Sequence, residues 1–432
     1  MTHNALNSNS FPDSSALDQP VRPLRVLVTG YRSHPHVGGQ GVYIRNLTRA
    51  LADLGHEVTV VSGPPYPELD PDIGLDTLPS LDLFAETNAF LALRPRHLGS
   101  WADMAEWLSH NTGAFGELYA FGVRLEAYIA RHHGRFDVIH DNQTLASPFV
   151  RIDRTLPVIT TLHHPIEIDR RFALEAGQSL KDRLFTRRWY RFVKMQARTS
   201  RALSRHLAVS AAARDTHAAL YGTRPETMRV AFNGLDHQVF YADHRVARRP
   251  GLIATTASAD APIKGLDVLI KAFAETARTH DTARLLIIGQ LRDGPAKRAL
   301  QSLGLENRVE TRSNLTREDI ATLYREASIV ACPARFEGFG FPAAEAMACG
   351  AAVAASDGGA LPEVVGETGL VSPAGDAPAL AANLNRLLQD DELRRQLGEA
   401  AIARARSAFH WSSHARTASR LYVEALAERG IH

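Results

Sequence analysis

Cysteine is almost absent from this sequence, with only Cys332 and Cys349 among 432 residues. Two cysteines at this spacing form neither a disulfide framework nor a zinc-binding pattern, so we expect both thiols to be reduced. No stretch approaches the roughly 18 consecutive apolar residues that a membrane-spanning helix needs. The net charge is only +2, and the mild basic excess of the N-terminal half does not indicate a nucleic-acid-binding protein.

The start of the chain also lacks the features of a secretion signal. Residues 1–20 have neither a basic start nor an apolar run, and they are rich in Asn, Ser, Asp and Pro. This composition predicts a disordered tail rather than a signal peptide. We therefore expect a cytoplasmic protein.

Apolar runs bounded by glycine or polar residues alternate with helical patterns along the chain. The first set of runs covers residues 24–30, 56–63, 136–142, 157–164 and 206–212. A second set covers residues 251–259, 284–289, 328–333 and 351–359. Strands separated by helices are the mark of a parallel α/β sheet. The sequence therefore predicts an α/β fold with two Rossmann-like parallel-sheet domains.

The boundary between these domains is expected near residues 230–251, which contain turn residues and show no periodicity. The predicted parts are a tail (1–20), an N-terminal domain (21–235), a C-terminal domain (236–410) and a last helix (411–432). A proline-rich insertion and further helices separate the second and third runs of the first domain. Insertions of this kind often shape a ligand site.

The segment FEGFGFPAAEAMACG (336–350) carries the strongest chemical signal. It places Glu337 before a glycine-rich turn and Glu345 in the helix that the turn opens. Helix N-termini bind anions such as phosphate, and Gly338 and Gly340 let the backbone approach a ligand closely. The two carboxylates can accept hydrogen bonds from two hydroxyl groups. The pattern predicts a site for a phosphorylated, hydroxyl-rich ligand; the alternative is a capped helix in which Glu345 complements the dipole.

Three shorter motifs support this interpretation. The glycine loop HPHVGGQG (34–41) follows a predicted strand, where such loops bind phosphate. No acidic residue follows at the end of the second strand, which disfavours a nicotinamide cofactor. Lys264 opens a predicted helix, where a nearby anion would stabilise its charge. His163 and His164 end a predicted strand and so face the ligand crevice. The alternatives are a tight turn, a solvated lysine and a structural histidine.

Together these motifs resemble the retaining glycosyltransferases of family four, which have the GT-B fold. The resemblance covers nearly all of the chain after the tail, and FEGFGFPAAEAMACG followed by ASDGGALPEVVGE is its most specific part. It implies two Rossmann-like domains that face a central cleft. It also implies a last helix that crosses back to the first domain, and a nucleotide-sugar donor held mainly by the second domain.

The resemblance assigns roles to individual residues. Glu337 is expected to contact sugar hydroxyls, and Glu345 is expected to contact the ribose. Lys264 and the loop at 39–41 are expected to hold the diphosphate. The expected catalytic residues are His163, Glu337 and Lys264. The expected donor-binding residues are Gly39, Gly41, Lys264, Glu337, Phe339, Gly340, Phe341 and Glu345. The expected acceptor-side residues are Arg32, His140 and His164.

The implied reaction is glycosyl transfer with retention at the anomeric carbon. The departing phosphate helps to deprotonate the acceptor, so neither a protein nucleophile nor a metal is expected. The donor is a cosubstrate, with a UDP-sugar favoured over a GDP- or ADP-sugar, and no further cofactor is implied. One departure concerns an arginine that the family usually has shortly before the Lys-Gly pair. Residues 255–260 contain none, and Arg335, Arg292 and Arg32 are the possible substitutes.

A basic segment at 181–206 is the main clue to the acceptor. Its basic residues recur every three or four positions, which predicts a continuous stripe along one helix face, with aromatic residues on another. Such a helix can lie on an anionic membrane surface. The alternative is a surface helix that buries its aromatic residues. The membrane-facing candidates are Arg187, Arg191, Lys194 and Arg198.

The sequence therefore predicts a hexosyltransferase that acts on a glycan, lipid or small-molecule hydroxyl, with peripheral contact to the inner face of a membrane. Two other functions stay open. The missing arginine is compatible with a protein that binds a nucleotide sugar without transferring it. A different GT-B reaction, such as that of a sugar phosphorylase or an epimerase, is the third. No nucleic-acid partner is expected.

Overall fold

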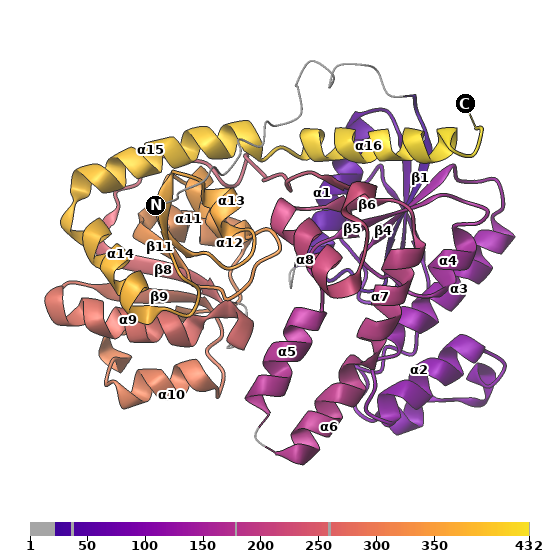
Figure 1. The fold of residues 1–432 in the computed structure, drawn as a ribbon, viewed down its shortest axis with the longest axis horizontal. Helices are drawn as coiled ribbons and strands as arrows, with labels where there is room; N and C mark the ends of the chain where they lie inside the picture. The colour runs from indigo at the N-terminus through magenta and orange to yellow at the C-terminus, as the bar shows by residue number, and fades with distance from the viewer. Residues whose placement is uncertain (1–21, 36–38, 178, 258–260, 432) are drawn as a thin grey trace, which may run out of the picture.

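A computed structural model of the protein describes residues 22–35, 39–177, 179–257 and 261–431. Within these residues the longer strands form two separate parallel sheets, one in each half of the molecule (Figure 1). The predicted α/β class with two parallel-sheet domains is confirmed. The tail predicted at residues 1–20 lies outside the described residues.

The first sheet has the strand order β3-β2-β1-β4-β5-β6-β7, and all neighbouring strands are parallel. Its strands are β1 (Arg25–Gly30), β2 (Glu57–Ser62), β3 (Gly74–Thr77), β4 (Val138–Asn142), β5 (Val158–Leu162), β6 (His206–Ala208) and β7 (Met228–Val230). The helices of this first unit are α1 (Gly39–Asp53), α2 (Trp101–Asn111), α3 (Glu117–Arg131), α4 (Pro148–Ile152), α5 (Glu167–Ala176), α6 (Leu180–Trp189), α7 (Val193–Ala202) and α8 (Ala211–Tyr221).

The second sheet has the order β10-β9-β8-β11-β12-β13 and is also parallel throughout. Its strands are β8 (Arg249–Ala257), β9 (Arg284–Gly289), β10 (Val309–Arg312), β11 (Ala327–Cys332), β12 (Ala352–Ser356) and β13 (Gly369–Ser372). The helices of this second unit are α9 (Leu266–Thr279), α10 (Pro295–Ser302), α11 (Arg317–Glu326), α12 (Phe341–Ala348), α13 (Leu361–Val365), α14 (Ala377–Gln389) and α15 (Asp391–Ala408).

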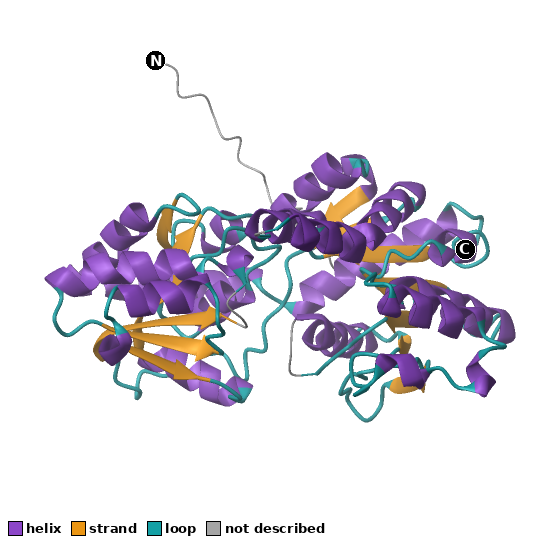
Figure 2. Cartoon of the chain, turned by 90° about the horizontal axis from the view of Figure 1, so that it is seen from below, coloured by secondary structure: helices purple, strands orange, loops and turns teal. Residues whose placement is uncertain are grey.

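Helices cover both faces of each sheet (Figure 2). Central strands such as β4 and β11 are consequently buried at every residue. This two-sided burial explains why they are continuous apolar runs in the sequence rather than alternating patterns.

Two neighbouring segments connect the units. One leads from β7 to β8, and the other joins α15 to the last helix, α16 (Trp411–Ala427). They touch where the Leu235 amide donates to the Phe409 carbonyl at 3.1 Å. A Cβ on Gly234 would lie 2.1 Å from the backbone nitrogen of Trp411, so only glycine fits there. From this junction α16 runs along the first unit and packs against α1 (Figure 1). The boundaries at 235/236 and 410/411 stay predictions.

The continuous helical stripe predicted across residues 181–206 is wrong. A 3-10 turn, η4 (Tyr190–Phe192), separates α6 from α7, and its aromatic residues pack inward, with the Phe192 ring 5.3 Å from that of Phe115. Arg205 lies beyond α7 and pairs with Glu424 of α16 at 2.8 Å. Packing of the apolar residues therefore breaks the helix that the charge spacing suggests. None of the helices in the described ranges is long and apolar enough to cross a membrane.

Candidate active site

The glycine-rich turn after β11 forms the centre of the candidate site. β11 ends at Cys332, and α12 begins at Phe341 with Pro342 in its first turn. Gly340 precedes the helix with a φ of 96°, a left-handed conformation that favours glycine. Pro342 has no N–H, and the Ala343 and Ala344 amides donate to the Gly340 carbonyl at 3.0 and 3.2 Å. The Phe341 amide and the positive end of the helix dipole therefore suit this end of α12 to an anionic group.

Lys264 and Glu337 meet beside this turn. Lys264 ends the 3-10 turn η6 (Pro262–Lys264), and its Nζ lies 2.7 Å from Oε1 of Glu337. Both residues line a hollow of about 20 Å³, together with Thr256 and Gly340. The two side chains keep 32% and 17% of their surface exposed, so a ligand can reach them. A diphosphate bound at the mouth of this hollow can attract Lys264 and leave Glu337 free to accept hydrogen bonds from hydroxyl groups.

Glu345 lies about one turn along α12, where its charge is disfavoured. Burial raises the pKa of Glu345 to about 8, although the charge of Arg317 acts in the opposite direction. At neutral pH the carboxyl group is therefore mostly protonated. Hydroxyl groups that donate hydrogen bonds to a carboxylate stabilise its ionised form, so a bound ribose would lower this pKa.

His163 follows β5 and faces the turn of the second unit. Burial, with the neighbouring histidines, lowers its pKa to about 3, so the imidazole is neutral. Its Nε2 lies 2.6 Å from Oδ1 of Asn142, and its backbone amide donates to Oε1 of Gln143. The ring also packs edge-to-face on Tyr43, with 4.7 Å between centroids. These contacts hold the histidine in one orientation.

The two units touch at this histidine. A Cβ on Gly338 would lie 2.0 Å from the carbonyl oxygen of His163, so the turn of the second unit approaches as closely as glycine allows. Ser210 Oγ, at the start of α8, donates to the Gly338 carbonyl at 2.6 Å. The Glu363 carboxylate of α13 accepts hydrogen bonds from the first two amides of α8 at 2.9 and 2.5 Å. This contact compensates the positive end of α8.

The predicted glycine loop lies near the same turn. α1 begins at Gly39, where a Cβ would be 4.0 Å from the Phe341 ring. A Cβ on Gly41 would lie 2.2 Å from the carbonyl oxygen of His34, so the loop folds back on itself. Residues 36–38 of the loop lie outside the described residues. The structure thus brings Gly39, Phe341, Glu337, Lys264 and His163 to one region, while their assigned roles stay predictions.

The predicted acceptor-side residues do not form one group. The role predicted for His140 is wrong, because its side chain is fully buried and hydrogen-bonded to Tyr422 and Thr161. His164 keeps partial exposure and pairs with Asp169 at 2.8 Å. Arg32 pairs with Glu117 at 3.2 Å.

Among the candidates for the missing arginine, Arg335 contacts the η6 turn that carries Lys264. Its backbone amide donates to the Ile263 carbonyl at 2.8 Å, directly before Lys264. Its guanidinium group forms a two-pronged pair with Asp267 at 2.9 and 2.8 Å. Arg292 is exposed. The structure therefore places one guanidinium group beside η6, already paired with a carboxylate.

Several contacts around the site were not singled out from the sequence. They involve Tyr43, Asn142, Ser210 and Glu363. Glu363 belongs to the LPEVV segment that contributed to the resemblance, and Asn142 ends a predicted strand. Ser210 lies in the apolar run predicted at residues 206–212. Tyr43 carried no local signal, because its partners lie far away in the chain.

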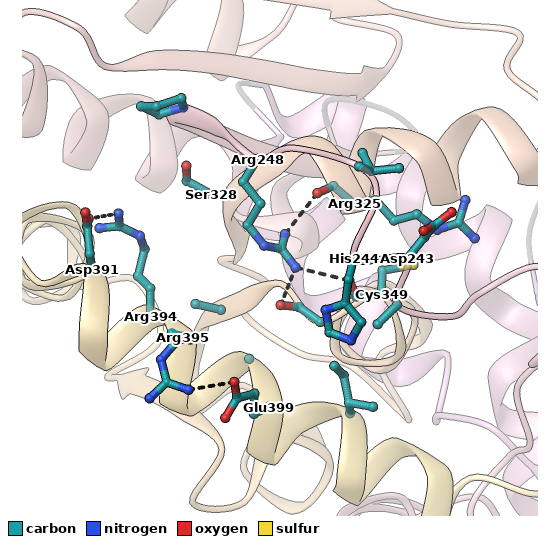
Figure 3. Close-up of a pocket in the computed structure, with 17 residues that line it drawn as sticks. Asp243, His244, Arg248, Arg325, Ser328, Cys349, Asp391, Arg394, Arg395 and Glu399 are labelled. Atoms are coloured by element: carbon teal, nitrogen blue, oxygen red, sulfur yellow. Dashed lines mark hydrogen bonds and ion pairs between the residues drawn. The ribbon is translucent and has the colours of Figure 1, made fainter.

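A larger cavity of about 330 Å³ lies at the opposite end of the second sheet, where β8, β11 and β12 begin (Figure 3). The arginines that line it already bond to other groups of the protein. Arg248 donates to the carbonyls of Ala327 and Cys349 at 2.6 and 3.1 Å, and Arg395 pairs with Glu399 at 2.7 Å. Ligands of open parallel sheets bind at the carboxyl ends of the strands, so this cavity is not part of the candidate site.

The fold and the site together define a glycosyltransferase of the GT-B type. Residues 248–404 match the family described as glycosyl transferases group 1, and residues 37–239 match glycosyltransferase family 4. The chain is 39% identical to an MMP α-(1→4)-mannosyltransferase of Mycolicibacterium hassiacum, over 94% of this chain and 99% of that protein. It is 27% identical to a D-inositol 3-phosphate glycosyltransferase of Acidothermus cellulolyticus, over 95% and 92% of the two chains. The chain therefore belongs to glycosyltransferase family 4.

Solved structures agree with this fold. The sucrose-phosphate synthase of Thermosynechococcus elongatus superposes with a TM-score of 0.71 at 24% identity, covering 94% of this chain and 100% of that one. Anabaena HepE, solved with UDP and glucose, superposes with a TM-score of 0.65 at 20% identity, covering 92% and 98%. At these identities the likeness concerns the fold alone.

Proposed function

We propose that this protein transfers a mannosyl residue from a nucleoside diphosphate sugar to a glycan hydroxyl group, with retention of the anomeric configuration. The observation that carries the proposal is the Lys264–Glu337 pair, which lines a hollow at the start of α12 and lies near His163. The relative at 39% identity over nearly the whole chain supports mannose as the sugar and an α-(1→4) linkage as the product.

The chemistry follows from the charges that develop during transfer. The bond from the anomeric carbon to the phosphate oxygen breaks, which leaves positive charge on the sugar and negative charge on the diphosphate. Lys264 and the backbone amides of Gly340 and Phe341, at the start of α12, stabilise the leaving group. A phosphate oxygen takes the proton of the acceptor hydroxyl as the new bond forms on the same face. The neutral imidazole of His163 adds no positive charge beside the developing cation.

The carboxyl groups orient the donor. Glu337, released by Lys264, accepts hydrogen bonds from sugar hydroxyls, and Glu345 accepts them from the ribose. The donor base is proposed to be uracil, and no metal is assigned. Thermal shift measurements with UDP- and GDP-sugars test the base, because a ligand that binds the folded state raises its apparent stability. A shift with GDP-mannose and none with UDP-sugars would replace uracil by guanine.

Contact with an anionic membrane surface is a further part of the proposal. Arg187, Arg191, Lys194 and Arg198 are exposed, and Leu184 of α6 exposes 64% of its surface. Exposed basic groups close to an exposed apolar side chain favour contact with anionic lipid. Cosedimentation with anionic and neutral vesicles tests this part, and equal, negligible binding to both would contradict it.

Transfer by the purified protein tests the central proposal. Nucleoside diphosphate release and product formation are measured with an α-(1→4)-linked oligomannoside as acceptor. Lys264→Ala is expected to lower kcat by about 100-fold or more, as removal of leaving-group stabilisation does elsewhere. Lys297→Ala is the matched control. Lys297 lies on α10, outside the candidate site, and its Nζ also pairs with a carboxylate at 2.6 Å. Donor binding without transfer would instead support a nucleotide-sugar-binding protein. Turnover that depends on phosphate would support a phosphorylase.

A further inference from the structure

A buried chain of side chains links α16 to the neighbourhood of His163. It consists of Tyr422, His140, Thr161, Tyr43 and His414, all fully buried. Tyr422 Oη lies 2.6 Å from His140 Nδ1, and His140 Nε2 lies 2.6 Å from Thr161 Oγ1. Thr161 Oγ1 is 2.6 Å from Tyr43 Oη, which is 2.8 Å from His414 Nε2. We call these five residues the buried chain.

The far end of the buried chain reaches the segment that connects the two units. His414 Nδ1 lies 3.2 and 3.1 Å from the carbonyl oxygens of Ala231 and Phe232. Both residues follow β7, close to the junction at Gly234 and Trp411. Carbonyl oxygens only accept hydrogen bonds, so His414 Nδ1 carries the proton.

That proton fixes the direction of every other bond. Burial lowers the pKa of His414 to about 4 and that of His140 to about 3, so each ring holds one proton. His414 Nε2 then accepts, and the Tyr43 hydroxyl donates to it. Thr161 must donate to Tyr43 and accept from His140 Nε2, and Tyr422 donates to His140 Nδ1. With His414 Nδ1 protonated, this is the only set of donor directions that places one proton in each hydrogen bond of the buried chain.

The buried chain holds the ring that packs on His163. The Tyr43 and His163 rings meet at 88° with 4.7 Å between centroids, and Thr161 lies two residues before His163 on the same segment. Loss of the His414 contact would leave the Tyr43 hydroxyl without its buried acceptor. Unpaired buried hydroxyls are costly, so Tyr43 would reorient and its support of His163 would be lost.

We propose that Tyr43 and His414 are positioning residues for His163, so that the last helix and the connecting segment take part in ordering the reaction site. The inference rests on the proposed function, which gives His163 its place beside the reacting sugar. It also implies that movement of the connecting segment away from His414 disorders His163. Neither residue is expected to touch the sugar.

Two substitutions at His414 test the proposal. Leucine removes both the donor and the acceptor, whereas glutamine supplies an amide NH2 group as donor and a carbonyl oxygen as acceptor. His414→Leu is expected to lower kcat by about tenfold or more with an unchanged donor KM, since small displacements of reacting groups cost rate. His414→Gln is expected to restore most of kcat. Tyr43→Phe, which keeps the ring, serves as the second variant if His414→Leu does not fold.

Ser419→Ala is the matched control. Ser419 Oγ also bonds α16 to the first unit, through His56 Nε2 at 2.8 Å. Its hydrogen bonds go to His56 and to the Ala415 carbonyl rather than to the buried chain, which it approaches only through the packing of His56 on Tyr422. The control is expected to keep kcat near the parent value. A kcat for His414→Leu no lower than that of Ser419→Ala, or a failure of His414→Gln to restore it, would overturn the proposal.

Crystal structures of the variants separate this inference from the proposed function. If no nucleotide sugar is turned over by the parent protein, the proposed function fails, but the position of His163 can still be seen. The His163 ring is expected to leave Asn142 in His414→Leu and to keep that contact in His414→Gln. An unchanged His163 ring in His414→Leu would overturn the inference by itself.

Discussion

Replacing Gly338 with alanine adds one methyl group where the two units touch. The new Cβ would lie 2.0 Å from the carbonyl oxygen of His163 and 3.2 Å from the Cβ of His164. Ordinary contacts between carbon and oxygen are about 3.3 Å or longer, so the units must separate by about 1 Å. Gly338 does not have a positive φ, so alanine adds no backbone strain within the turn itself.

The expected result is a large loss of activity with little loss of stability. A displacement of about 1 Å can cost about 100-fold in rate, equal to about 2.7 kcal/mol in the barrier. We expect kcat/KM for transfer to fall by this order in Gly338→Ala, while the unfolding temperature changes by only a few degrees. Gly99→Ala is the matched control, because a Cβ on Gly99 meets nothing within 4 Å. A kcat/KM within about threefold of the parent would show that the added methyl group does not displace the reacting groups.

Three further outcomes are expected. The pKa of Glu345 is raised to about 8, and ribose hydroxyls favour its ionised form, so nucleotide binding at pH 7.5 should release protons. Calorimetry in buffers of different ionisation enthalpy measures this release, and an equal release in Glu345→Gln would contradict the prediction. Glu363→Gln should weaken the contact between the units by about 1–2 kcal/mol, seen as a larger radius of gyration in X-ray scattering, and an unchanged radius would count against it. His217 is buried without a side-chain hydrogen bond, and burial lowers its pKa. Because the folded protein keeps His217 neutral while the unfolded chain protonates it, the histidine lowers the free energy of unfolding increasingly as the pH falls below about 6.5. His217→Leu should therefore raise the unfolding temperature more at pH 5 than at pH 7.5, and the opposite order would exclude this explanation.

The strands in the middle of each sheet were predictable, and the edge strands were not. Strands such as β4 and β11 are buried on both faces and are therefore apolar throughout. The strands that the sequence did not reveal are β3, β7, β10 and β13, the outer strands of the two sheets. They are three or four residues long and partly exposed. Short strands with one free edge need no apolar run, so they leave no pattern to read.

The candidate site was predictable where it depends on local chemistry. The turn at Gly340, Lys264 at the end of η6 and His163 after β5 each follow a strand, and parallel strands bring such residues to one edge. His140 misled the prediction, because it also lies on a strand but its side chain points into the core. The contacts of Tyr43 and His414 could not be predicted, since they depend on how α16, more than 370 residues further along, packs against α1.

The configuration of the transferred sugar distinguishes retaining transfer from inverting transfer and from donor binding alone. The purified protein is incubated with an α-linked nucleoside diphosphate mannose and an α-(1→4)-linked oligomannoside, and the first product is examined by proton NMR. We expect one added mannose in the α configuration, formed at a rate that falls in Lys264→Ala but not in Lys297→Ala. A β-linked product, or donor binding with no transfer, would contradict this expectation.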